Sequence, residues 1–333
     1  MRLIVVNSSF KWGILGASKF AFEQMAPAIH SAKGNSLVAL ATKDSKKAKK
    51  FLALSDTLNI HYDYNDLLED PNIDAVYIPL PNHLHIEWAM RCLKAGKHVL
   101  CEKPISMVAE EIDGLIELRD RTRLLAAEAY MVVHHPQWQL VKEFVDSGKL
   151  GKLVQIDGVF SYNNLDDPMN IRNQAQYGGG GIPDIGVYPY GLSRFITGLE
   201  PSEILHADIV FENGVDTWAN ISAQFPGFKM QAVTSMRSAP RQEMTIQGME
   251  GFLKLTAPFN PNVYDIAQIT FRKGDELEQV FKFPAANHYV NQVEAFSLAA
   301  TTDEAYGCTL EFSKGTQTMI DMVYEKNRKL LQE

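Results

Sequence analysis

The sequence has few cysteines, no excess of positive charge and no long apolar run. Its 333 residues include only Cys92, Cys101 and Cys308, which are far apart and odd in number, so they predict neither a disulfide framework nor a zinc cluster. The net charge of -8 argues against a nucleic-acid partner, because there is no surplus of cations to neutralise phosphates. No stretch approaches the roughly 18 apolar residues of a membrane span, so we expect no membrane partner.

The start of the chain also lacks the pattern of a secretory signal. In MRLIVVNSS an apolar run of only four residues follows Arg2, which is too short for the apolar region of a signal peptide. Together with the few cysteines this favours a cytoplasmic protein. Residues 1–9 fit either an extra strand or a loose tail. Neither a repeat nor a low-complexity linker is present, so a domain boundary has to be read from changes in pattern.

From Phe10 to about Tyr130 the chain alternates short apolar runs with amphipathic segments. The strand-like runs are FKWGIL, SLVALAT, DAVYIPL, HVLCEK and LLAAEAY, and helical segments such as HIEWAMRCLKAG lie between them. Apolar strands between helices imply βαβ units and a parallel sheet covered on both faces. We therefore predict an α/β, doubly wound domain over residues 1–130, with ligands bound beyond the carboxyl ends of its strands.

The pattern changes after PQWQLVKEFVDSGKLG. From KLVQIDGVFSYN onward alternating strands follow one another with turn signals such as ENG, FPG and KGD, which predicts a large, open, mostly antiparallel sheet. Three helical segments, YGLSRFITG, NQVEAFSLAATT and GTQTMIDMVYEKNRKLLQ, are expected to cover one face of this sheet. Residues 131–333 are predicted to form a second, α+β domain that binds the substrate.

The first strand runs directly into GILGASKFA, a degenerate dinucleotide-binding fingerprint. Gly16 stands at the turn glycine, Ser18 at the second glycine and Ala21 at the third. A small residue at position 18 lets backbone N–H groups approach a pyrophosphate at the start of a helix. We predict a cofactor-binding turn that includes these residues with Lys19 and Phe20. A glycine turn without a ligand is the alternative.

The end of the second strand indicates which dinucleotide is bound. An acid at this place favours NAD, whereas a cation accommodates the 2′-phosphate of NADP. The strand ends at Thr42 and Lys43, so the sequence predicts NADP. The lysines that follow could equally form only a solvated helix face, and the neighbouring Asp44 keeps NAD possible.

Polar residues also follow the next two strands. Pro81, Asn82 and His85 come after the run ending at Leu80, and we expect them to line the cofactor. His83 and His85 form an H-x-H pair, but no third ligand has a suitable spacing, so no metal is predicted.

The run HVLCEKP ends a strand at Glu102, Lys103 and Pro104. Glu102 offers acceptors for a ribose, and Pro104 fixes the direction in which the chain leaves the sheet. We predict that Lys103 is functional, and a lysine that merely extends from the sheet edge into solvent is the alternative.

Taken together, these motifs resemble the Gfo/Idh/MocA oxidoreductases. The similar stretches occur in the family's order and cover nearly the whole chain: GILGASKFA, PNHLH, GKHVLCEKP, AAEAYMVVHHPQW, GKLGKLVQI and GGGGIPDIGVYPYG. The resemblance implies a Rossmann domain followed by an α/β domain whose open sheet commonly forms an oligomer interface, hence a homodimer or homotetramer. Tyr188, where inositol-oxidising members often carry histidine, points to the branch of xylose dehydrogenases, glucose-fructose oxidoreductases and dimeric dihydrodiol dehydrogenases.

The resemblance also implies roles for single residues. Lys103 corresponds to the lysine that contacts the nicotinamide ribose and the reacting hydroxyl, and Glu102 to its ribose-binding neighbour. Asp184 and Tyr188 would share one face if their segment is helical, and Pro189 predicts a kink there. Tyr188 is the candidate proton acceptor, and the cationic Lys103 would stabilise a developing alkoxide. The sequence leaves open which of the two carries the proton, and a core tyrosine is the alternative for Tyr188.

Further positions are candidates for the substrate site. His85 is a third possible catalytic participant, although a positioning role fits it better. Met131, His135 and Trp138 are candidate substrate contacts, with packing as the alternative. Arg172 is a candidate for binding substrate hydroxyl groups, with a plain loop arginine as the alternative. Val133 stands where arginine is common in the sugar-oxidising branch, so an anionic contact at that position is not expected.

The predicted function is an NADP-preferring oxidoreductase, with NAD possible, that acts on a carbohydrate-like or cyclic diol substrate. Two alternatives share the scaffold: a dinucleotide or sugar sensor without turnover, and a glycosidase that oxidises its substrate transiently with bound NAD.

Overall fold

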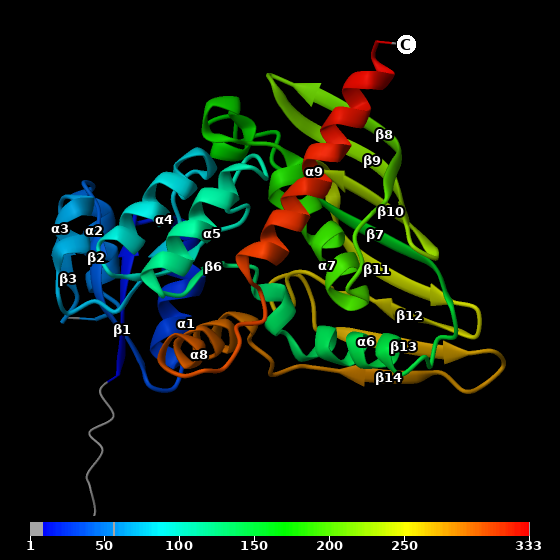
Figure 1. Ribbon diagram of the computed structural model, residues 1–333, viewed down its shortest axis with the longest axis horizontal. Helices are drawn as coiled ribbons and strands as arrows, with labels where there is room; N and C mark the ends of the chain where they lie inside the picture. The colour runs from blue at the N-terminus through cyan, green and yellow to red at the C-terminus, as the bar shows by residue number, and fades with distance from the viewer. Residues whose placement is uncertain (1–8, 56, 333) are drawn as a thin grey trace, which may run out of the picture. The chain divides into compact units, whose positions relative to one another are not determined.

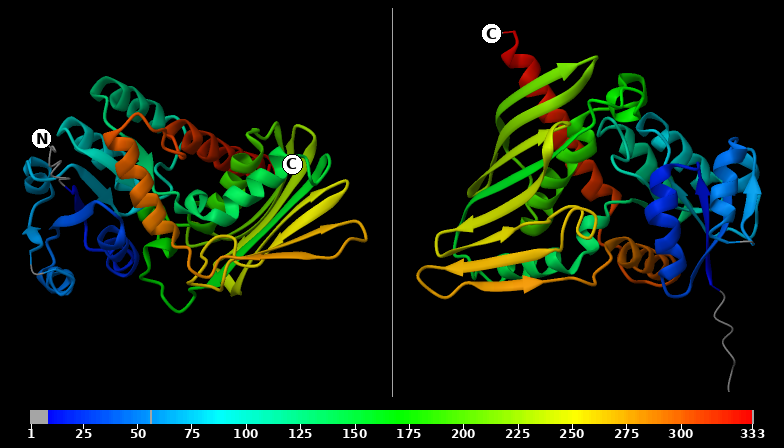
Figure 2. Two further views of the ribbon diagram at one scale, coloured as in Figure 1. Left: turned by 90° about the horizontal axis from the view of Figure 1, so that it is seen from below. Right: turned by 180° about the vertical axis from the view of Figure 1, so that it is seen from behind.

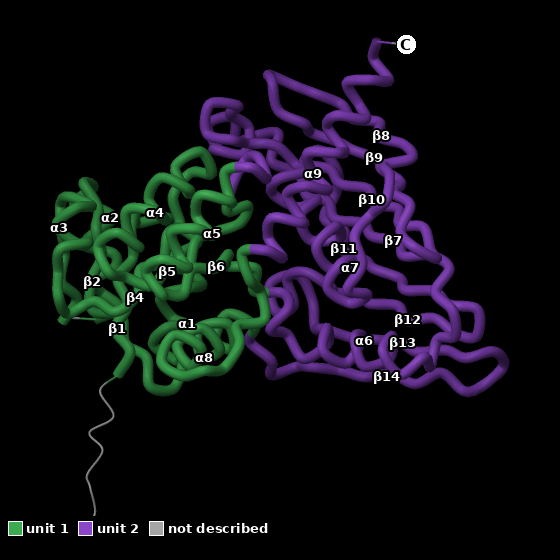
Figure 3. Tube along the Cα trace, in the orientation of Figure 1, with its two compact units in different colours: residues 1–105, 111–131, 288–310 green, residues 106–110, 132–287, 311–333 purple. Residues whose placement is uncertain are grey.

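The structure is a computed structural model that describes residues 9–55 and 57–332. The expectation of an extra strand or a tail at the start of the chain lies outside these residues, apart from Ser9. The chain folds into two compact units (Figure 3). Unit 1 contains the chain up to residue 105 together with residues 111–131 and 288–310, and unit 2 contains residues 106–110, 132–287 and the chain from residue 311 onward.

Unit 1 is built on a six-stranded parallel sheet with the order β3-β2-β1-β4-β5-β6. This is the strand order of a dinucleotide-binding doubly wound sheet, and it confirms the predicted fold class. All four residues of β4 are buried, as expected for a strand that is covered on both faces. The strands are β1 (Phe10–Leu15), β2 (Asn35–Ala41), β3 (Asn59–His61), β4 (Ala75–Ile78), β5 (His98–Cys101) and β6 (Ala126–Glu128).

One helix of unit 1 comes from late in the chain. Helix α8 contacts α1 and β2, and the ring of its Phe296 lies 5.1 Å from that of the fully buried Trp12. This helix was expected to cover the second sheet, and that expectation was wrong. The apolar face of an amphipathic helix does not specify the sheet against which the helix packs. The helices of unit 1 are η1 (Ala21–Met25), α1 (Ala26–Ser31), α2 (Ser45–Leu52), α3 (Tyr64–Glu69), η2 (Asn82–Leu84), α4 (His85–Lys94), α5 (Glu111–Thr122) and α8 (His288–Thr301).

Unit 2 is built on an eight-stranded sheet with the order β14-β13-β12-β11-β7-β10-β9-β8. Its pairs are antiparallel except for β7 with β10, so the predicted mostly antiparallel sheet is confirmed. The strands are β7 (Leu153–Asn163), β8 (Glu203–Glu212), β9 (Val215–Phe225), β10 (Phe228–Ser235), β11 (Arg237–Gly248), β12 (Gly251–Leu255), β13 (Gln268–Lys273) and β14 (Gln279–Lys282).

The helices of unit 2 gather on one face of this sheet (Figures 1 and 2). Side chains of β9 alternate between buried and partly exposed from Ala219 to Phe225, as a sheet with one covered face requires. Short 3₁₀ segments and one π-helix supplement the long helices. These elements are η3 (Met131–His134), which begins at the end of unit 1, α6 (Pro136–Asp146), η4 (Ile171–Asn173), η5 (Ala175–Tyr177), η6 (Ile182–Gly186), α7 (Val187–Thr197) and α9 (Leu310–Leu330).

The segment that carries Asp184 and Tyr188 is not a regular α-helix. Residues Ile182–Gly186 form a π-helix, and α7 continues directly from it with Pro189 inside. Proline has no N–H to donate, and π turns commonly occur where the regular ladder is interrupted. The predicted kink is therefore realised as a widened turn before Pro189, and the α-helical spacing assumed for Asp184 and Tyr188 does not hold over its first half.

Within the described residues, no helix combines the length and apolar character that crossing a membrane requires. The same part of the chain contains no cluster of three or more His, Cys, Asp or Glu side chains suited to a metal ion.

Candidate active site

The first strand of unit 1 ends in a tight turn at Gly16. The φ angle of this residue is +108°, and a Cβ placed there would lie 2.8 Å from a methyl carbon of Leu80. Ser18 Oγ accepts a hydrogen bond from the Ala21 amide over 3.0 Å, which starts the first turn of η1. Ala21 is fully buried, whereas the Lys19 side chain is exposed and forms an ion pair with Glu23. The turn therefore presents backbone at the carboxyl end of β1, where a pyrophosphate would approach.

The ring of Phe20 belongs to the same turn and meets Tyr289 of α8 edge to face, with centroids 5.6 Å apart. Through this ring contact helix α8 packs against the predicted cofactor-binding turn. The sequence did not indicate this contact, because the two residues are far apart along the chain.

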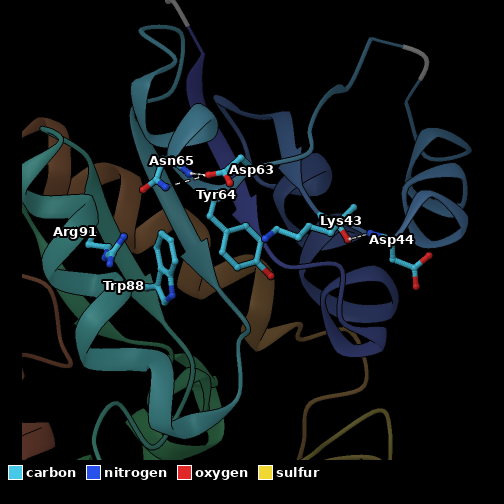
Figure 4. Close-up of a pocket in the computed structure, with 8 residues that line it drawn as sticks. Lys43, Asp44, Asp63, Tyr64, Asn65, Trp88 and Arg91 are labelled. Atoms are coloured by element: carbon cyan, nitrogen blue, oxygen red, sulfur yellow. Dashed lines mark hydrogen bonds between the residues drawn. The ribbon is translucent and has the colours of Figure 1, made fainter.

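A cavity of about 540 Å³ opens at the end of β2. Its walls combine aromatic rings, cations and polar groups contributed by three separate segments (Figure 4): Thr42, Lys43, Asp44, Asp63, Tyr64, Asn65, Trp88 and Arg91. The rings of Tyr64 and Trp88 meet edge to face at 5.1 Å, and the Arg91 guanidinium carbon lies 4.7 Å from the Trp88 ring centroid. The long side chain of Lys43 extends toward Tyr64 from the opposite side.

Asp44 follows Lys43 directly and is the N-cap of α2. Its Oδ1 accepts hydrogen bonds from the amides of Lys46 and Lys47 at 2.9 and 3.1 Å. These bonds, that from Lys47 foremost, lower the pKa of the Asp44 carboxyl. The Asp44 amide in turn donates to Thr42 Oγ1 over 3.2 Å. One oxygen of the carboxylate is thus used by its own helix, and Lys43 and Asp44 both line the cavity at the end of β2.

The cavity fits the adenosine end of a dinucleotide. Aromatic rings suit a base, and Lys43 and Arg91 suit a phosphate. Tyr64, Trp88 and Arg91 were not identified from the sequence. They lie on helices rather than directly after strands, so the rule that finds polar residues at strand ends does not reach them.

His85 links two loops at the carboxyl edge of the sheet. Its ring is fully buried, with Nδ1 2.7 Å from the Pro104 carbonyl oxygen and Nε2 2.7 Å from that of Leu80. Burial lowers the pKa of the imidazole, although both carbonyl oxygens oppose this shift. Both carbonyl oxygens are acceptors, so the neutral ring donates its single N–H to one of them, and only the protonated ring donates to both. In either form His85 lies between the loop after β4 and the loop after β5 and contacts both. Pro81 lies in the first of these loops as the N-cap of η2, and Asn82 is the first residue of η2.

Glu102 and Lys103 follow β5 as predicted. Glu102 Oε1 accepts a hydrogen bond from the Tyr77 hydroxyl over 2.6 Å, and burial raises the pKa of the Glu102 carboxyl while Tyr77 and Lys103 oppose the shift. The peptide bond between Lys103 and Pro104 is cis. Tyr77, in β4, was not identified from the sequence because it lies inside an apolar strand.

In unit 2 a charged cluster forms around Asp184. Arg172 Nε lies 2.9 Å from Asp184 Oδ2, and the Tyr162 hydroxyl donates to the same oxygen over 2.7 Å. The charge of Asp184 raises the pKa of Arg172, and burial raises the pKa of Tyr162. The structure thus brings together two predicted residues, Arg172 and Asp184. Tyr162 was not identified from the sequence, because it lies inside β7 and not in the loop that follows the strand.

Tyr188 lies at the start of α7 with its ring in an aromatic cluster. Its centroid is 5.7 Å from those of both Phe160 and Phe259, and those two rings stack on each other at 4.9 Å. Tyr188 is also near enough to Arg172 to influence the pKa of the guanidinium. Tyr188 is 4% exposed, so its phenol lies among aromatic rings with a guanidinium group nearby.

The remaining predicted substrate contacts are buried in packing. His135 caps α6, accepting the Gln137 amide at Nδ1 over 3.1 Å, and burial lowers the pKa of its ring to about 4. Trp138 donates its indole N–H to the Pro258 carbonyl oxygen over 2.8 Å. Met131 is 3% exposed. All three side chains are buried, and their role as substrate contacts stays a prediction.

Comparison with known families gives two matches that cover most of the chain. Residues 10–130 match the family described as "Oxidoreductase family, NAD-binding Rossmann fold" under the designation GFO_IDH_MocA. Residues 138–254 match "GFO/IDH/MocA C-terminal domain".

Individual relatives span nearly their full length. The chain is 37% identical to the "Uncharacterized oxidoreductase ORF334" of Rhizobium meliloti, covering 94% of this chain and 95% of that protein. It is 30% identical to "D-xylose 1-dehydrogenase (NADP(+)) 2" of Haloferax volcanii, covering 94% and 96%.

Among solved structures the chain is similar to KijD10, a 3-ketoreductase from Actinomadura kijaniata in complex with NADP and TDP-benzene. The TM-score is 0.87 at 28% identity, covering 96% of this chain and 98% of that one. Other solved structures of KijD10 carry a tyrosine-to-phenylalanine or a lysine-to-alanine replacement.

Proposed function

The chain belongs to the Gfo/Idh/MocA family of oxidoreductases, and from that premise we propose that it transfers a hydride between NADP and a hydroxyl or carbonyl group of a sugar, polyol or cyclic diol. The observation that carries the proposal is the cluster of unit 2, where Arg172, Asp184 and Tyr162 meet near Tyr188. A few hydrogen-bonding groups in a largely apolar setting are typical of sites that orient a small hydroxylated substrate.

We assign Tyr188 and Lys103 to the reacting oxygen. Bound NADP supplies the hydride acceptor. When the carbon–hydrogen bond of the alcohol breaks, the hydroxyl proton must also leave, and Tyr188 is the proposed acceptor. Lys103 stabilises the negative charge that develops on the oxygen, and Arg172 lowers the cost of a phenolate at Tyr188. In the reduction direction Tyr188 returns the proton. The lysine and tyrosine replaced in KijD10 lie nearly as far apart in its chain as Lys103 and Tyr188 do here.

Other predicted residues have supporting roles in this proposal. Asp184 and Arg172 hold substrate hydroxyl groups, and Tyr162 keeps the Asp184 carboxylate in place. Glu102 accepts hydrogen bonds from the nicotinamide ribose. His85 is a positioning residue for the loop that carries Lys103, because both of its ring nitrogens lie 2.7 Å from backbone carbonyl oxygens.

The proposed preference for NADP is supported by the charges at the end of β2. Lys43 and Arg91 supply positive charge in the cavity, Arg91 is also paired with Glu87 over 2.7 Å, and Asp44 caps α2. A 2′-phosphate placed between the two cations would gain charge-assisted hydrogen bonds that a 2′-hydroxyl cannot match. NAD is expected to be accepted with lower kcat/KM.

The test is a substrate screen that follows NADPH absorbance with pentoses, hexoses, inositols and trans-diols, and with nucleotide-linked keto sugars in the reducing direction. We expect turnover with at least one class, and NADPH that appears in free solution. Tightly retained cofactor with bond cleavage but no net NADPH would indicate the glycosidase alternative. Dinucleotide binding without turnover in any class would indicate a sensor, and either result would overturn the proposal.

We also propose that the protein forms a homodimer or homotetramer through the open face of the eight-stranded sheet. Three partly buried residues of neighbouring strands share that face: Trp218, Val233 and Val159. Sedimentation of the wild-type chain and of Trp218→Glu distinguishes an oligomer from a monomer.

A further inference from the structure

Asp216 is a carboxylate buried beneath the glycine run of unit 2. It lies near the start of β9, is 2% exposed, and has hydrogen-bond donors from two other segments. Oδ2 accepts the amide of Ile182 over 2.6 Å, and the amide of Gly181 also donates to the carboxylate. Oδ1 accepts the hydroxyl of Tyr324 over 2.7 Å. The carboxylate thus joins β9, helix α9 and the first residues of η6.

These contacts account for two glycines of the run. The φ angle of Gly180 is +134°, and a Cβ at this residue would overlap Asp216 Oδ1. A Cβ at Gly181 would lie 3.2 Å from Oδ2. A Cβ at Gly179 would instead meet the carbonyl oxygens of Ile171 and Arg172. The backbone at Gly180 and Gly181 therefore lies close to a carboxylate of the same chain.

The first amides of a helical segment have no partner within the segment and must be satisfied from outside. Asp216 supplies this partner from a residue that is 34 positions away in the chain. Asp184 follows the capped amide after two residues and Tyr188 after six, so the point that Asp216 fixes is the start of the segment that carries both.

We propose that Asp216 is a positioning residue of the reaction: its carboxylate holds the start of the segment Ile182–Tyr188 and thereby sets where the Asp184 and Tyr188 side chains lie. This inference rests on the proposed function of those two residues. Asp216 acts through the backbone amides that it binds, and Tyr324 holds the carboxylate in the orientation in which it can do so.

Burial raises the pKa of Asp216 to about 6, against the hydrogen bonds from Tyr324 and the amides of Ile182 and Gly181, which lower it. The titratable groups that face it are Tyr190 from α7 and Tyr324 from α9. The anchor is therefore charged at neutral pH and becomes protonated below about pH 6. A protonated carboxyl is a weaker acceptor for the two amides, so the positioning is expected to loosen on acidification.

The experiment compares Asp216→Asn and Tyr324→Phe with Tyr190→Phe as the matched control. The Tyr190 hydroxyl is buried near Asp216 but makes no hydrogen bond with any of the residues that the structure describes, so its removal should leave kcat unchanged. Asp216→Asn keeps the shape and removes the charge. A displacement of about 1 Å at a reacting group can lower the rate roughly 100-fold, and we expect a loss of that order in kcat with an unchanged KM for NADP.

The pH profile separates positioning from mere support of the fold. Wild-type kcat should fall below about pH 6, and this acid limb of the profile should be absent in Asp216→Asn. In Tyr324→Phe the acid limb should move to higher pH, because a hydrogen bond that lowers the pKa of Asp216 is lost. Wild-type kcat in Asp216→Asn, or an acid limb that does not move in Tyr324→Phe, would overturn the inference. Tyr324→Phe keeps the test decisive if Asp216→Asn does not fold.

A second measurement does not depend on turnover. Amide hydrogen exchange over residues 181–188 should rise in Asp216→Asn and stay at the wild-type rate in Tyr190→Phe, while peptides of β1 and β4 are unaffected. If the wild-type chain turns over no sugar, polyol or diol, the proposed function fails. If turnover is present but exchange over residues 181–188 is unchanged in Asp216→Asn, only the present inference fails.

Discussion

Arg172 and Asp184 form an ion pair in unit 2, with Nε 2.9 Å from Oδ2, and the same carboxylate oxygen receives the Tyr162 hydroxyl. The ion pair is partly buried: the Arg172 side chain is 42% exposed and the Asp184 side chain is 12% exposed. A carboxylate with two donors on one oxygen is fixed in orientation but is a poor general base, because both interactions stabilise its charged form. In the proposed reaction Asp184 is therefore assigned to orienting groups, and the proton transfer to Tyr188.

Asp184→Asn is expected to lower kcat/KM roughly 100-fold, since the amide leaves the Arg172 guanidinium without its counter-charge. Tyr162→Phe should cost less, about 10-fold, because it removes one hydrogen bond to a charged group. Steady-state kinetics measures both. Glu243→Gln is the matched control, as it breaks an exposed ion pair with Arg241 in the same unit and should leave kcat/KM unchanged. Equal effects of the two acid-to-amide variants would contradict the assignment.

Lys103→Met and Tyr188→Phe should each lower kcat by a factor of roughly 10² to 10⁴, the range attributed to a positioned proton donor or acceptor. Binding of NADP, followed by fluorescence titration, should change little in either variant. Lys97→Met is not a suitable control because its ammonium group donates to the carbonyl oxygens of Asp70 and Ile73 and supports the fold. Lys94, exposed at the end of α4, serves instead as Lys94→Met. Wild-type turnover in Lys103→Met or Tyr188→Phe refutes that residue's role.

Lys43→Glu should lower the ratio of kcat/KM for NADP to that for NAD roughly 10- to 100-fold, the value of one or two charge-assisted hydrogen bonds. Arg91→Ala should shift the ratio in the same direction. Lys49→Glu makes the same charge change on the exposed side of α2, outside the cavity, and controls for a long-range effect of charge. If Lys49→Glu shifts the ratio as far as Lys43→Glu does, the lysines act only as a diffuse positive field.

The folding stability should depend on pH through Asp216. Because its pKa is raised from 3.8 to about 6 in the folded chain, the folded state holds a proton that the unfolded state releases between these values. Stability from this group is therefore greatest below about pH 4 and is lost as the pH rises to 6, by about 3 kcal/mol at most. Urea unfolding at pH 4.5 and pH 7 should show a smaller loss in Asp216→Asn than in the wild type, and an identical loss in both would contradict the prediction.

Gly180→Ala should destabilise unit 2 far more than Gly227→Ala. Both glycines have positive φ angles, +134° and +92°, so each alanine carries backbone strain of about 1 kcal/mol. Only at Gly180 does the new methyl group meet a buried carboxylate, and relieving that overlap should bring the loss to about 3 kcal/mol. Thermal unfolding of the two variants gives the comparison, and similar losses would show that the surroundings of Asp216 can yield.

The sequence predicts those features that depend on local pattern. The apolar runs identify β1, β2, β4, β5 and β6 and hence the residues that follow them, so Thr42, Lys43, Glu102 and Lys103 are found without a structure. Strand β3 was missed because its three residues contain only one apolar side chain, Ile60, and it is recognised only by its pairing with β2.

Features that depend on contacts between distant residues were not predictable in the same way. Asp216 is one acid in an alternating strand, and only the folded chain brings it beneath Ile182. Trp88 and Arg91 lie on the amphipathic helix α4, and only the folded chain brings them to the cavity at the end of β2. His85 was predicted to line the cofactor, and it is the first residue of α4. Its contacts with Leu80 and Pro104 depend on the spacing of two adjacent strands and were not predictable.

The return of α8 to unit 1 has a consequence for how the chain folds as it is synthesised. The N-terminal parts of a chain generally begin to fold first during translation, but here the helix that covers Trp12 and supports Phe20 emerges only after the strands of unit 2. Until then β1 and α1 present an uncovered apolar surface. The nascent unit 1 therefore needs protection from aggregation for most of the time that the chain is being synthesised. A fragment ending at residue 131 would keep the apolar surface of β1 and α1 exposed permanently.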